Sequence, residues 1–193
     1  VEGTSGKHKS AMMGLAAGLG SAAGTMIGAG LTKAVDLVTD SFSQAITGAG
    51  ALQQSIGAID TVFKGGASQM HAWAQTAAND VGLTQNEFNE LGTLIGTQLK
   101  NGGTAMEQLA PKTNNLIKLG ADLSSMFGGS SREAVEALSS ALKGERDPIE
   151  KYGVTLTQAK IDAEAAALGF KKVGGSLSDE ANQAATLSLI MKQ

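Results

Sequence analysis

Residues 31–63 read LTKAVDLVTDSFSQAITGAGALQQSIGAIDTVF, and apolar or small side chains recur through them in alternating steps of four and three. This spacing is the heptad pattern of a helix that buries one apolar face. The self-association seam, as we name this face, consists of Leu31, Val35, Val38, Phe42, Ala45, Ala49, Leu52, Ile56, Ile59 and Phe63. The stretch therefore predicts a long amphipathic helix and an all-α fold.

The seam has two possible uses, pairing with other copies of the chain and packing against its own later helices. Positions that flank the seam are mostly uncharged, so ion pairs between helices do not select the partner. Both uses stay open from the pattern alone. We expect a homo-oligomer.

An uncharged stretch precedes the seam, because no charged residue lies between Lys9 and Lys33. Residues 11–31 are long enough to cross a bilayer as a helix. They are rich in glycine, which contributes little to membrane insertion and allows close helix packing, so a buried or self-packed helix is favoured. The expected organisation is a Gly/Ala-rich helical segment over 1–32, an amphipathic heptad helix over 33–64 and a helical domain over 65–193.

From Gly65 onward the pattern changes to short helices that glycines interrupt. Three capping boxes, which place a Ser or Thr three residues before a Glu, predict helix starts at Thr84, Thr104 and Ser130. Glycines that end these helices are Gly102–Gly103, Gly128–Gly129 and Gly144. Two more helices are expected, over about 157–168 and from about 178 to the end. The fold prediction is thus a long Gly/Ala-rich helix followed by a bundle of short helical hairpins.

Composition excludes several classes of function. The 193 residues include 26 glycines and no cysteine, and the net charge is −3. Disulfides, thiolate metal sites and cysteine nucleophiles are therefore excluded. The basic residues are spread along the chain, so we expect no sequence-specific nucleic-acid binding.

No motif of an active site is present in the sequence. His8 and His71 are the only imidazoles, and neither has the spacing of a zinc ligand pair. The neighbouring acids Glu145 and Asp147 are typical of a solvated helix end. We expect a non-enzymatic protein with no metal and no cofactor, in which Trp73 anchors the core.

Residues 132–169 read REAVEALSSALKGERDPIEKYGVTLTQAKIDAEAAALG, and this segment resembles tape measure proteins of long-tailed phages. The shared pattern is a helix that ends in Leu and Gly-Glu, an acidic-Pro-aliphatic turn, an aromatic-Gly-Val step and an Ala-rich helix that ends in Leu-Gly. Its turn comprises Gly144, Glu145, Pro148, Ile149, Tyr152, Gly153 and Val154, with Tyr152 where the family usually has Phe. We call these residues the family-like turn.

Pro148 also has a local consequence, because proline biases the residue before it away from the helical region. We therefore expect Asp147 to be non-helical, and Tyr152 and Val154 to hold the turn in the core.

The resemblance extends loosely from about residue 63 to 193, and it implies a function. Such a chain, here a fragment from the earlier part, lies along the tail axis, sets tail length, scaffolds assembly of the tail tube and is ejected ahead of the genome. Implied partners are tail tube proteins, tail assembly chaperones, tail tip proteins and, during ejection, the host membrane. The implied location is the tube lumen of the virion tail, and the host cytoplasm during assembly. Two alternatives stay open, a membrane-active pore-forming module and a part of an envelope-degrading enzyme.

Overall fold

The computed structural model describes residues 48–192. The chain divides into two units, 1–48 and 49–193, and the description below concerns the second unit. Five seam residues lie outside the described residues, as does the uncharged stretch 11–31; they are Leu31, Val35, Val38, Phe42 and Ala45. The described part is mostly helical and its only extended pairing is one bridge between Val173 and Ser176, so the predicted all-α class is confirmed.

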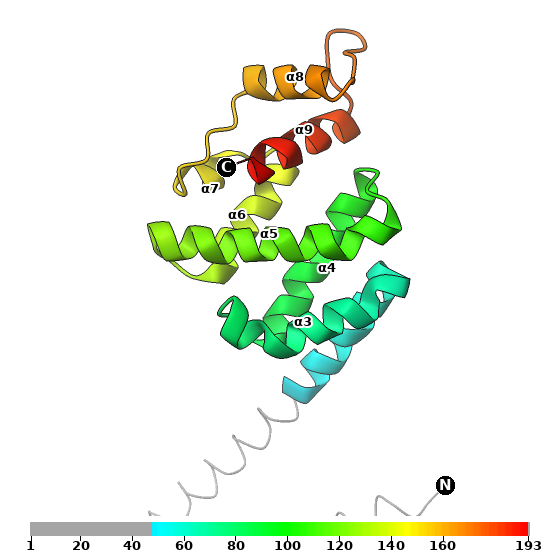
Figure 1. The fold of residues 1–193 in the computed structure, drawn as a ribbon, viewed down its shortest axis with the longest axis vertical. Coiled ribbons are helices and arrows are strands. Elements are labelled where there is room, and N and C mark those ends of the chain that lie inside the picture. Colours follow the sequence, from blue (N-terminus) through cyan, green and yellow to red (C-terminus); the bar gives the residue numbers. More distant parts are fainter. Residues whose placement is uncertain (1–47, 193) are drawn as a thin grey trace, which may run out of the picture. The chain divides into compact units, whose positions relative to one another are not determined.

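A helix over 48–63 leads through a short 3-10 turn, η1, into seven further helices (Figure 1). Their bounds are η1 Lys64–Gly66, α3 Ala67–Asp80, α4 Gln85–Asn101, α5 Met106–Phe127, α6 Ser131–Leu142, α7 Asp147–Glu150, α8 Gln158–Ala167 and α9 Asp179–Met191.

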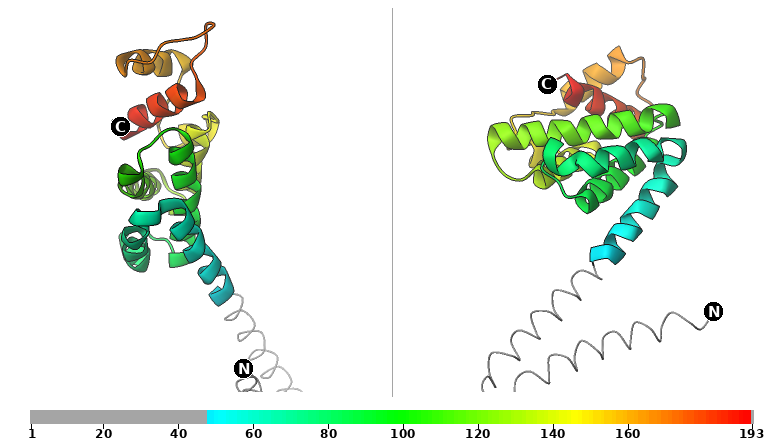
Figure 2. Two further views of the ribbon diagram at one scale, coloured as in Figure 1. Left: turned by 90° about the vertical axis from the view of Figure 1, so that its right-hand side faces the viewer. Right: turned by 60° about the horizontal axis from the view of Figure 1, so that its bottom comes forward.

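The core lies where α3, α4, α5 and α6 meet. α5 packs most extensively against α6, and α4 packs against α3, α5 and α6. Figures 1 and 2 show α5 crossing α4, with α3 on one side and the α8–α9 pair on the other. Apolar side chains of α4, α5 and α6 supply much of this core, including Phe88, Leu91, Ile95, Leu99, Leu116, Val135 and Leu138.

Two of the three predicted capping boxes form. The Thr84 and Ser130 hydroxyls accept hydrogen bonds from the backbone N–H groups of Glu87 and Glu133, and each Glu carboxylate accepts one in return. Such reciprocal bonds satisfy N–H groups that have no partner inside the helix. Gly128 caps α5 with a φ of +86°, which explains why glycine ends this helix.

The predicted helix start at Thr104 is wrong. The Thr104 backbone N–H donates to the Leu99 carbonyl at 2.9 Å, so this residue closes the end of α4 instead of opening α5. Ala105 is the N-cap of α5, and no side chain caps it. The expectation for Asp147 is also wrong, because Asp147 and Pro148 form the first turn of α7. Proline is tolerated there, since first-turn N–H groups have no partner inside a helix.

The last two helices form a pair at the edge of the bundle. α8 and α9 pack mainly against each other, and α9 also contacts α6. Their N-caps are Thr157 and Ser178, which confirms the predicted starts of both helices.

Candidate functional site

The described part of the self-association seam changes character along its length. Ala49 is exposed, Leu52 and Ile56 are half-buried, and Ile59 and Phe63 are fully buried. The last turn of the helix over 48–63 therefore belongs to the chain's own core, and only the earlier seam residues face outward in part.

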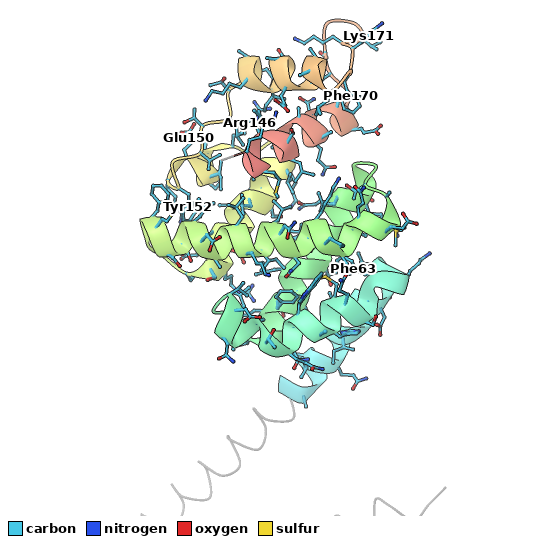
Figure 3. All side chains as sticks on the ribbon, in the orientation of Figure 1. Phe63, Arg146, Glu150, Tyr152, Phe170 and Lys171 are labelled. Atoms are coloured by element: carbon cyan, nitrogen blue, oxygen red, sulfur yellow. The ribbon has the colours of Figure 1, made fainter. Side chains whose placement is uncertain are left out.

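Two glycines of α4 lie against buried side chains, and one of them provides the space that buries Phe63. A Cβ placed on Gly96 would lie 2.3 Å from Phe63 Cζ, whereas one placed on Gly92 would lie 2.9 Å from Met70 Cε and at an ordinary contact distance of 3.4 Å from Ile59 Cδ1. Figure 3 shows Phe63 inside the bundle. The absence of a side chain at Gly96 lets the Phe63 ring lie directly against α4, so Gly96 acts as a seat for this seam residue.

A polar contact lies on α4 one turn before these two glycines. The Asn89 side-chain amide of α4 donates to Ser55 Oγ at 3.2 Å, and both residues are buried. Asn89 Oδ1 has no hydrogen-bond partner in the structure, which makes this contact weaker than a fully paired one. The helix over 48–63 therefore contacts α4 through a polar pair at Ser55 and through apolar side chains in the turns that follow.

The family-like turn forms a compact connection between α6 and α8. Gly144 and Gly153 have φ values of +97° and +73°, which L side chains rarely adopt. The Glu145 and Tyr152 N–H groups donate to the Ser140 and Ile149 carbonyls, each at 3.0 Å. These bonds fix the path of the backbone on both sides of α7.

Buried side chains attach the turn to the bundle. Ile149, Tyr152 and Val154 are buried, as we expect for Tyr152 and Val154, whereas Glu145 and Pro148 are exposed. Figure 3 shows Tyr152 beside the end of α5, and a Cβ on Gly153 would lie 3.0 Å from Phe127 Cζ of that helix. The turn thus presents a polar outer surface over three buried anchors.

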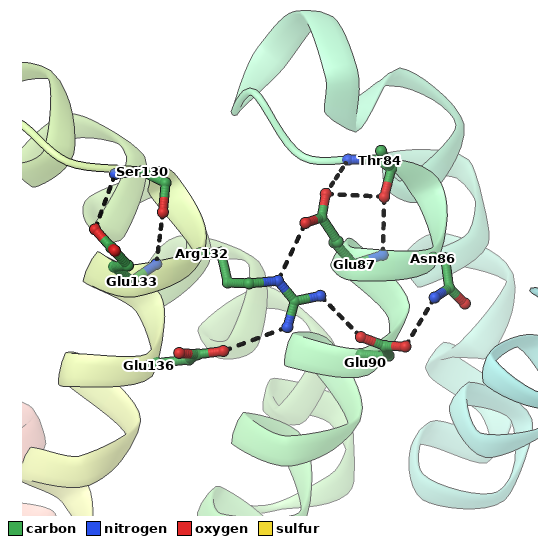
Figure 4. Close-up of polar contacts among 8 residues, drawn as sticks. All are labelled: Thr84, Asn86, Glu87, Glu90, Ser130, Arg132, Glu133 and Glu136. Carbon is green, nitrogen blue, oxygen red and sulfur yellow. Dashed lines mark hydrogen bonds and ion pairs between the residues drawn. The ribbon is translucent and has the colours of Figure 1, made fainter. Parts of the chain in front are cut away.

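Arg132 joins the start of α6 to the start of α4 (Figure 4). Its guanidinium donates to Glu87 at 3.1 Å, to Glu90 at 2.8 Å and to Glu136 at 3.3 Å. Glu87 is also the acid of the Thr84 capping box, so this ion-pair network connects directly to a helix cap.

The network shifts the ionisation of its members in the expected directions. Hydrogen bonds from the Thr84 backbone and hydroxyl, followed by the one from Arg132, hold the pKa of Glu87 below its ordinary value. Hydrogen bonding to Glu90 is the main cause that raises the pKa of Arg132. Each charged form is favoured because its partner is close and oriented.

The α8–α9 pair has ion pairs of its own. Glu164 of α8 accepts from Lys192 Nζ and from the Ser188 hydroxyl, both at 2.6 Å, and the Lys192 bond is the main cause that lowers the pKa of Glu164. Asp162 pairs with Lys172 at 2.7 Å, and this hydrogen bond likewise lowers the pKa of Asp162. These contacts hold α8 to α9 and to the loop between them.

Two grooves lie between the α8–α9 pair and the rest of the bundle. The polar groove, about 790 Å³, is lined by charged and amide side chains from the ends of α4 and α6 and from α8 and α9. The α5–α9 groove, about 710 Å³, is more apolar and lies between the first half of α5 and one face of α9. Both volumes fall within the range of binding pockets, roughly 300–1,000 Å³.

The remaining candidate residues serve packing or pairing. His71 lies 2.8 Å from Asp60, and Trp73 is half-buried against the core. Within residues 48–192, no three His, Asp or Glu side chains are placed to hold a metal ion. The same part of the chain has no helix that is both long and apolar enough to cross a membrane.

Sequence reasoning did not find the Arg132 network or the grooves. Glu87, Glu90 and Glu136 lie on the surfaces of two helices far apart in the sequence, so only the fold brings them to one guanidinium. No protein-family model matches the chain, and neither the curated proteins nor the solved structures contain a match.

Proposed function

We propose that the chain is part of a phage tail tape measure protein. In this role it is a structural protein without catalytic activity that sets tail length, scaffolds assembly of the tail tube and is ejected ahead of the genome. The observation that carries the proposal is the family-like turn. Its glycines Gly144 and Gly153 adopt positive φ, and its apolar residues Ile149, Tyr152 and Val154 are buried anchors. The residues that resemble the family pattern are thus also the residues whose backbone conformation and burial form the turn.

The proposal divides the work between an extended and a compact part. A long Gly/Ala-rich helix with a heptad seam would extend by about 1.5 Å per residue, whereas a bundle of short helical hairpins adds little length. Length is then set mainly by extended stretches, and residues 65–193 act in docking or delivery. Because Ile59 and Phe63 are buried within the chain, pairing of copies through the seam would end at about Ile56.

The partners and the location follow from this role. The chain would lie in the lumen of the tail tube, in contact with tube subunits and tail tip proteins, after assembly with chaperones in the host cytoplasm. Several copies would associate through the outer part of the seam, where Ala49, Leu52 and Ile56 are not fully buried.

The test is a deletion of two heptads, residues 35–48, from the gene in a phage that carries this chain. Removing 14 residues keeps the seam in register and shortens an extended helix by about 21 Å. A matched control replaces the same residues by other heptads of equal length. We expect electron micrographs to show shorter tails for the deletion and normal tails for the control.

Other outcomes separate the two parts of the proposal. Tails of normal length on particles that fail to infect would place this region in docking or genome delivery. Tails of normal length with normal infectivity, or purified tails that lack the chain by mass spectrometry, would refute the proposal.

A membrane-active, pore-forming role is the second candidate. The uncharged residues 11–31, which lie outside the described residues, motivate it. Partition of the chain into liposomes that is lost on deletion of 11–31 would support this role, and it is compatible with a tail protein. For the third candidate, an envelope-degrading enzyme, we expect no release of peptidoglycan fragments by the purified chain.

A further inference from the structure

The α8–α9 pair is attached more firmly within itself than to the rest of the bundle. Among the described helices, α8 packs extensively against α9 alone, and α9 makes a smaller contact with α6. Figures 1 and 2 show α9 between α8 and the rest of the bundle. The position of α8 in the fold therefore depends on α9.

The ion pairs of the α8–α9 pair stay inside it. Glu164 of α8 accepts from Lys192 Nζ, which directly follows α9, at 2.6 Å. Asp162 of α8 accepts from Lys172 Nζ, in the loop between the two helices, at 2.7 Å. Among residues 48–192, no ion pair joins the α8–α9 pair to another part of the chain. The two helices and their loop are thus a cohesive unit, of the kind that opens as a whole.

Two grooves interrupt the interface between this unit and the bundle. The polar groove has Thr186 of α9 in its lining, and the α5–α9 groove has Leu187. Their volumes are about 790 and 710 Å³. Helices that meet in a close-packed core leave no space of this size between them. Separating α9 from the bundle therefore exposes less apolar surface than separating two core helices, and costs less free energy.

Two polar contacts link the unit to the bundle. The start of α9 touches the end of α4, where a Cβ on Gly102 would overlap the Gln183 side-chain amide and lie 3.3 Å from Gln183 Cγ. Arg146 Nη2, before α7, donates to Gln158 Oε1 of α8 at 2.9 Å. Water replaces polar partners at a small net cost, so these links hold the unit only weakly.

The segment that leads from the bundle to α8 has the properties of a hinge. Residues 151–157 lie between α7 and α8 and belong to neither helix. Val154 and Leu156 are buried and anchor the segment, whereas Thr155 and Thr157 are exposed. Thr157, the N-cap of α8, directly follows the last anchor. Hinges consist of a few such residues at the end of an element, and a change of backbone angles at Thr157 moves α8 and α9 together.

We propose that the α8–α9 pair is a lid that opens as one unit about Thr157 and closes on the contact between Gly102 and Gln183. In the closed state, Leu99 at the end of α4 lines the α5–α9 groove and Leu142 at the end of α6 lines the polar groove, and both are buried. Opening joins the two grooves and uncovers these two side chains. The lid thus controls access to the ends of α4 and α6. The inference goes beyond the tail role and does not depend on it.

Hydrogen exchange of the full chain, followed by mass spectrometry of its fragments, measures the opening. We expect the amides of α8 and α9 to exchange together, and at least about tenfold faster than the amides of α5 and α6. The reason is that the lid opens while the bundle stays folded, whereas amides of the core exchange only when the whole bundle unfolds.

A disulfide tests whether this exchange requires the lid to leave α4. In the double variant Gly102→Cys with Gln183→Cys, the new sulfur at position 183 takes the place of Gln183 Cγ, which is within disulfide reach of a Cβ at position 102. Gly102 has a φ of −83°, which cysteine adopts readily. The chain contains no other cysteine, so the reduced form of the same variant is the matched control. Oxidation should slow the exchange of α8 and α9 until it is no faster than that of α5 and α6.

Two arginine variants test the opening without a disulfide. Arg146→Met removes the hydrogen bond to Gln158 and should speed the exchange of α8 and α9 about fivefold. Arg132→Met is the matched control, because Arg132 bonds only to α4 and α6 and its bonds remain when the lid opens. This control should leave the exchange of α8 and α9 unchanged. Circular dichroism checks that every variant retains its helices.

Three results would overturn the proposal. The first is equal exchange of α8, α9, α5 and α6 in the unchanged chain. The second is exchange of α8 and α9 that stays faster than that of the core after oxidation, because these helices would then fray without leaving α4. The third is a gain in the exchange of α8 and α9 with Arg132→Met as large as with Arg146→Met. The first and third results decide the matter even if the double cysteine variant does not fold.

Discussion

Replacing Gly120 with alanine tests the close contact between helices α5 and α6. Gly120 is buried on α5 where it crosses α6, and a Cβ there would lie 2.4 Å from Val135 Cγ2, 3.0 Å from Val135 N and 3.1 Å from Val135 Cα. Rotation of the Val135 side chain relieves only the first of these contacts. The other two involve the backbone, so the helices α5 and α6 must move apart.

The expected loss of stability combines two opposing effects. Overpacking of a filled core costs about 1–3 kcal/mol, and the upper end applies here because backbone atoms are in contact. Alanine also gains up to about 1 kcal/mol over glycine inside a helix. The free energy of unfolding should therefore fall by about 2 kcal/mol, which lowers the melting temperature by roughly 4–8 °C in a chain of this size.

Urea unfolding followed by circular dichroism measures this change, and Gly57→Ala is the matched control. Gly57 is exposed in the helix over 48–63, and a Cβ there has no neighbour within 4 Å. This control should keep or raise the free energy of unfolding, by up to about 1 kcal/mol. If Gly120→Ala is as stable as Gly57→Ala, the close contact of α5 with α6 is refuted.

Three further predictions concern ion pairs, pH and the seam. Arg132→Met removes three partly exposed ion pairs, so urea unfolding should show a loss of about 1–2 kcal/mol that becomes smaller in 1 M salt. The pKa of Glu87 is lower in the folded chain than its ordinary 4.5, so its stabilisation is complete above that pH and is lost as pH falls through the folded value. An unfolding series from pH 6 to pH 3 should show this fall in stability, and Glu87→Gln should flatten it; a parallel curve would contradict it. Ile59→Ala should cost about 2–5 kcal/mol because Ile59 is fully buried, whereas half-buried Leu52→Ala should cost less than half as much. Equal losses by urea unfolding would contradict the burial of the last seam turn in the chain's own core.

Helix boundaries could be predicted well where a local hydrogen bond decides them. Ser130 and Thr84 cap their helices through bonds that span only three residues, and glycine supplies the positive φ after α5. The pattern at Thr104 has the same letters, but its N–H group bonds back to Leu99. When a capping motif directly follows a helix end, its first backbone N–H group can instead bond back to the closing turn of that helix. At Thr104 this second hydrogen bond is the one that forms.

Contacts between distant residues could not be predicted in the same way. The heptad pattern identifies Ile59 and Phe63 as apolar seam residues, but it does not say which surface covers them. Gly96 decides that question for Phe63, and within an isolated sequence this glycine looks like a weak point of a helix. The grooves beside α9 likewise depend on how the α8–α9 pair sits on α6, which no local pattern encodes.

The seat that Gly96 provides for Phe63 has a consequence for natural variation. With Phe63 in place, any side chain at position 96 collides with the Phe63 ring. A substitution at either position is therefore tolerated only together with a matching change at the other. In homologous chains, a residue larger than glycine at position 96 should occur only where position 63 has become smaller. This covariation of two positions would indicate a shared fold even between chains whose overall sequence identity is low.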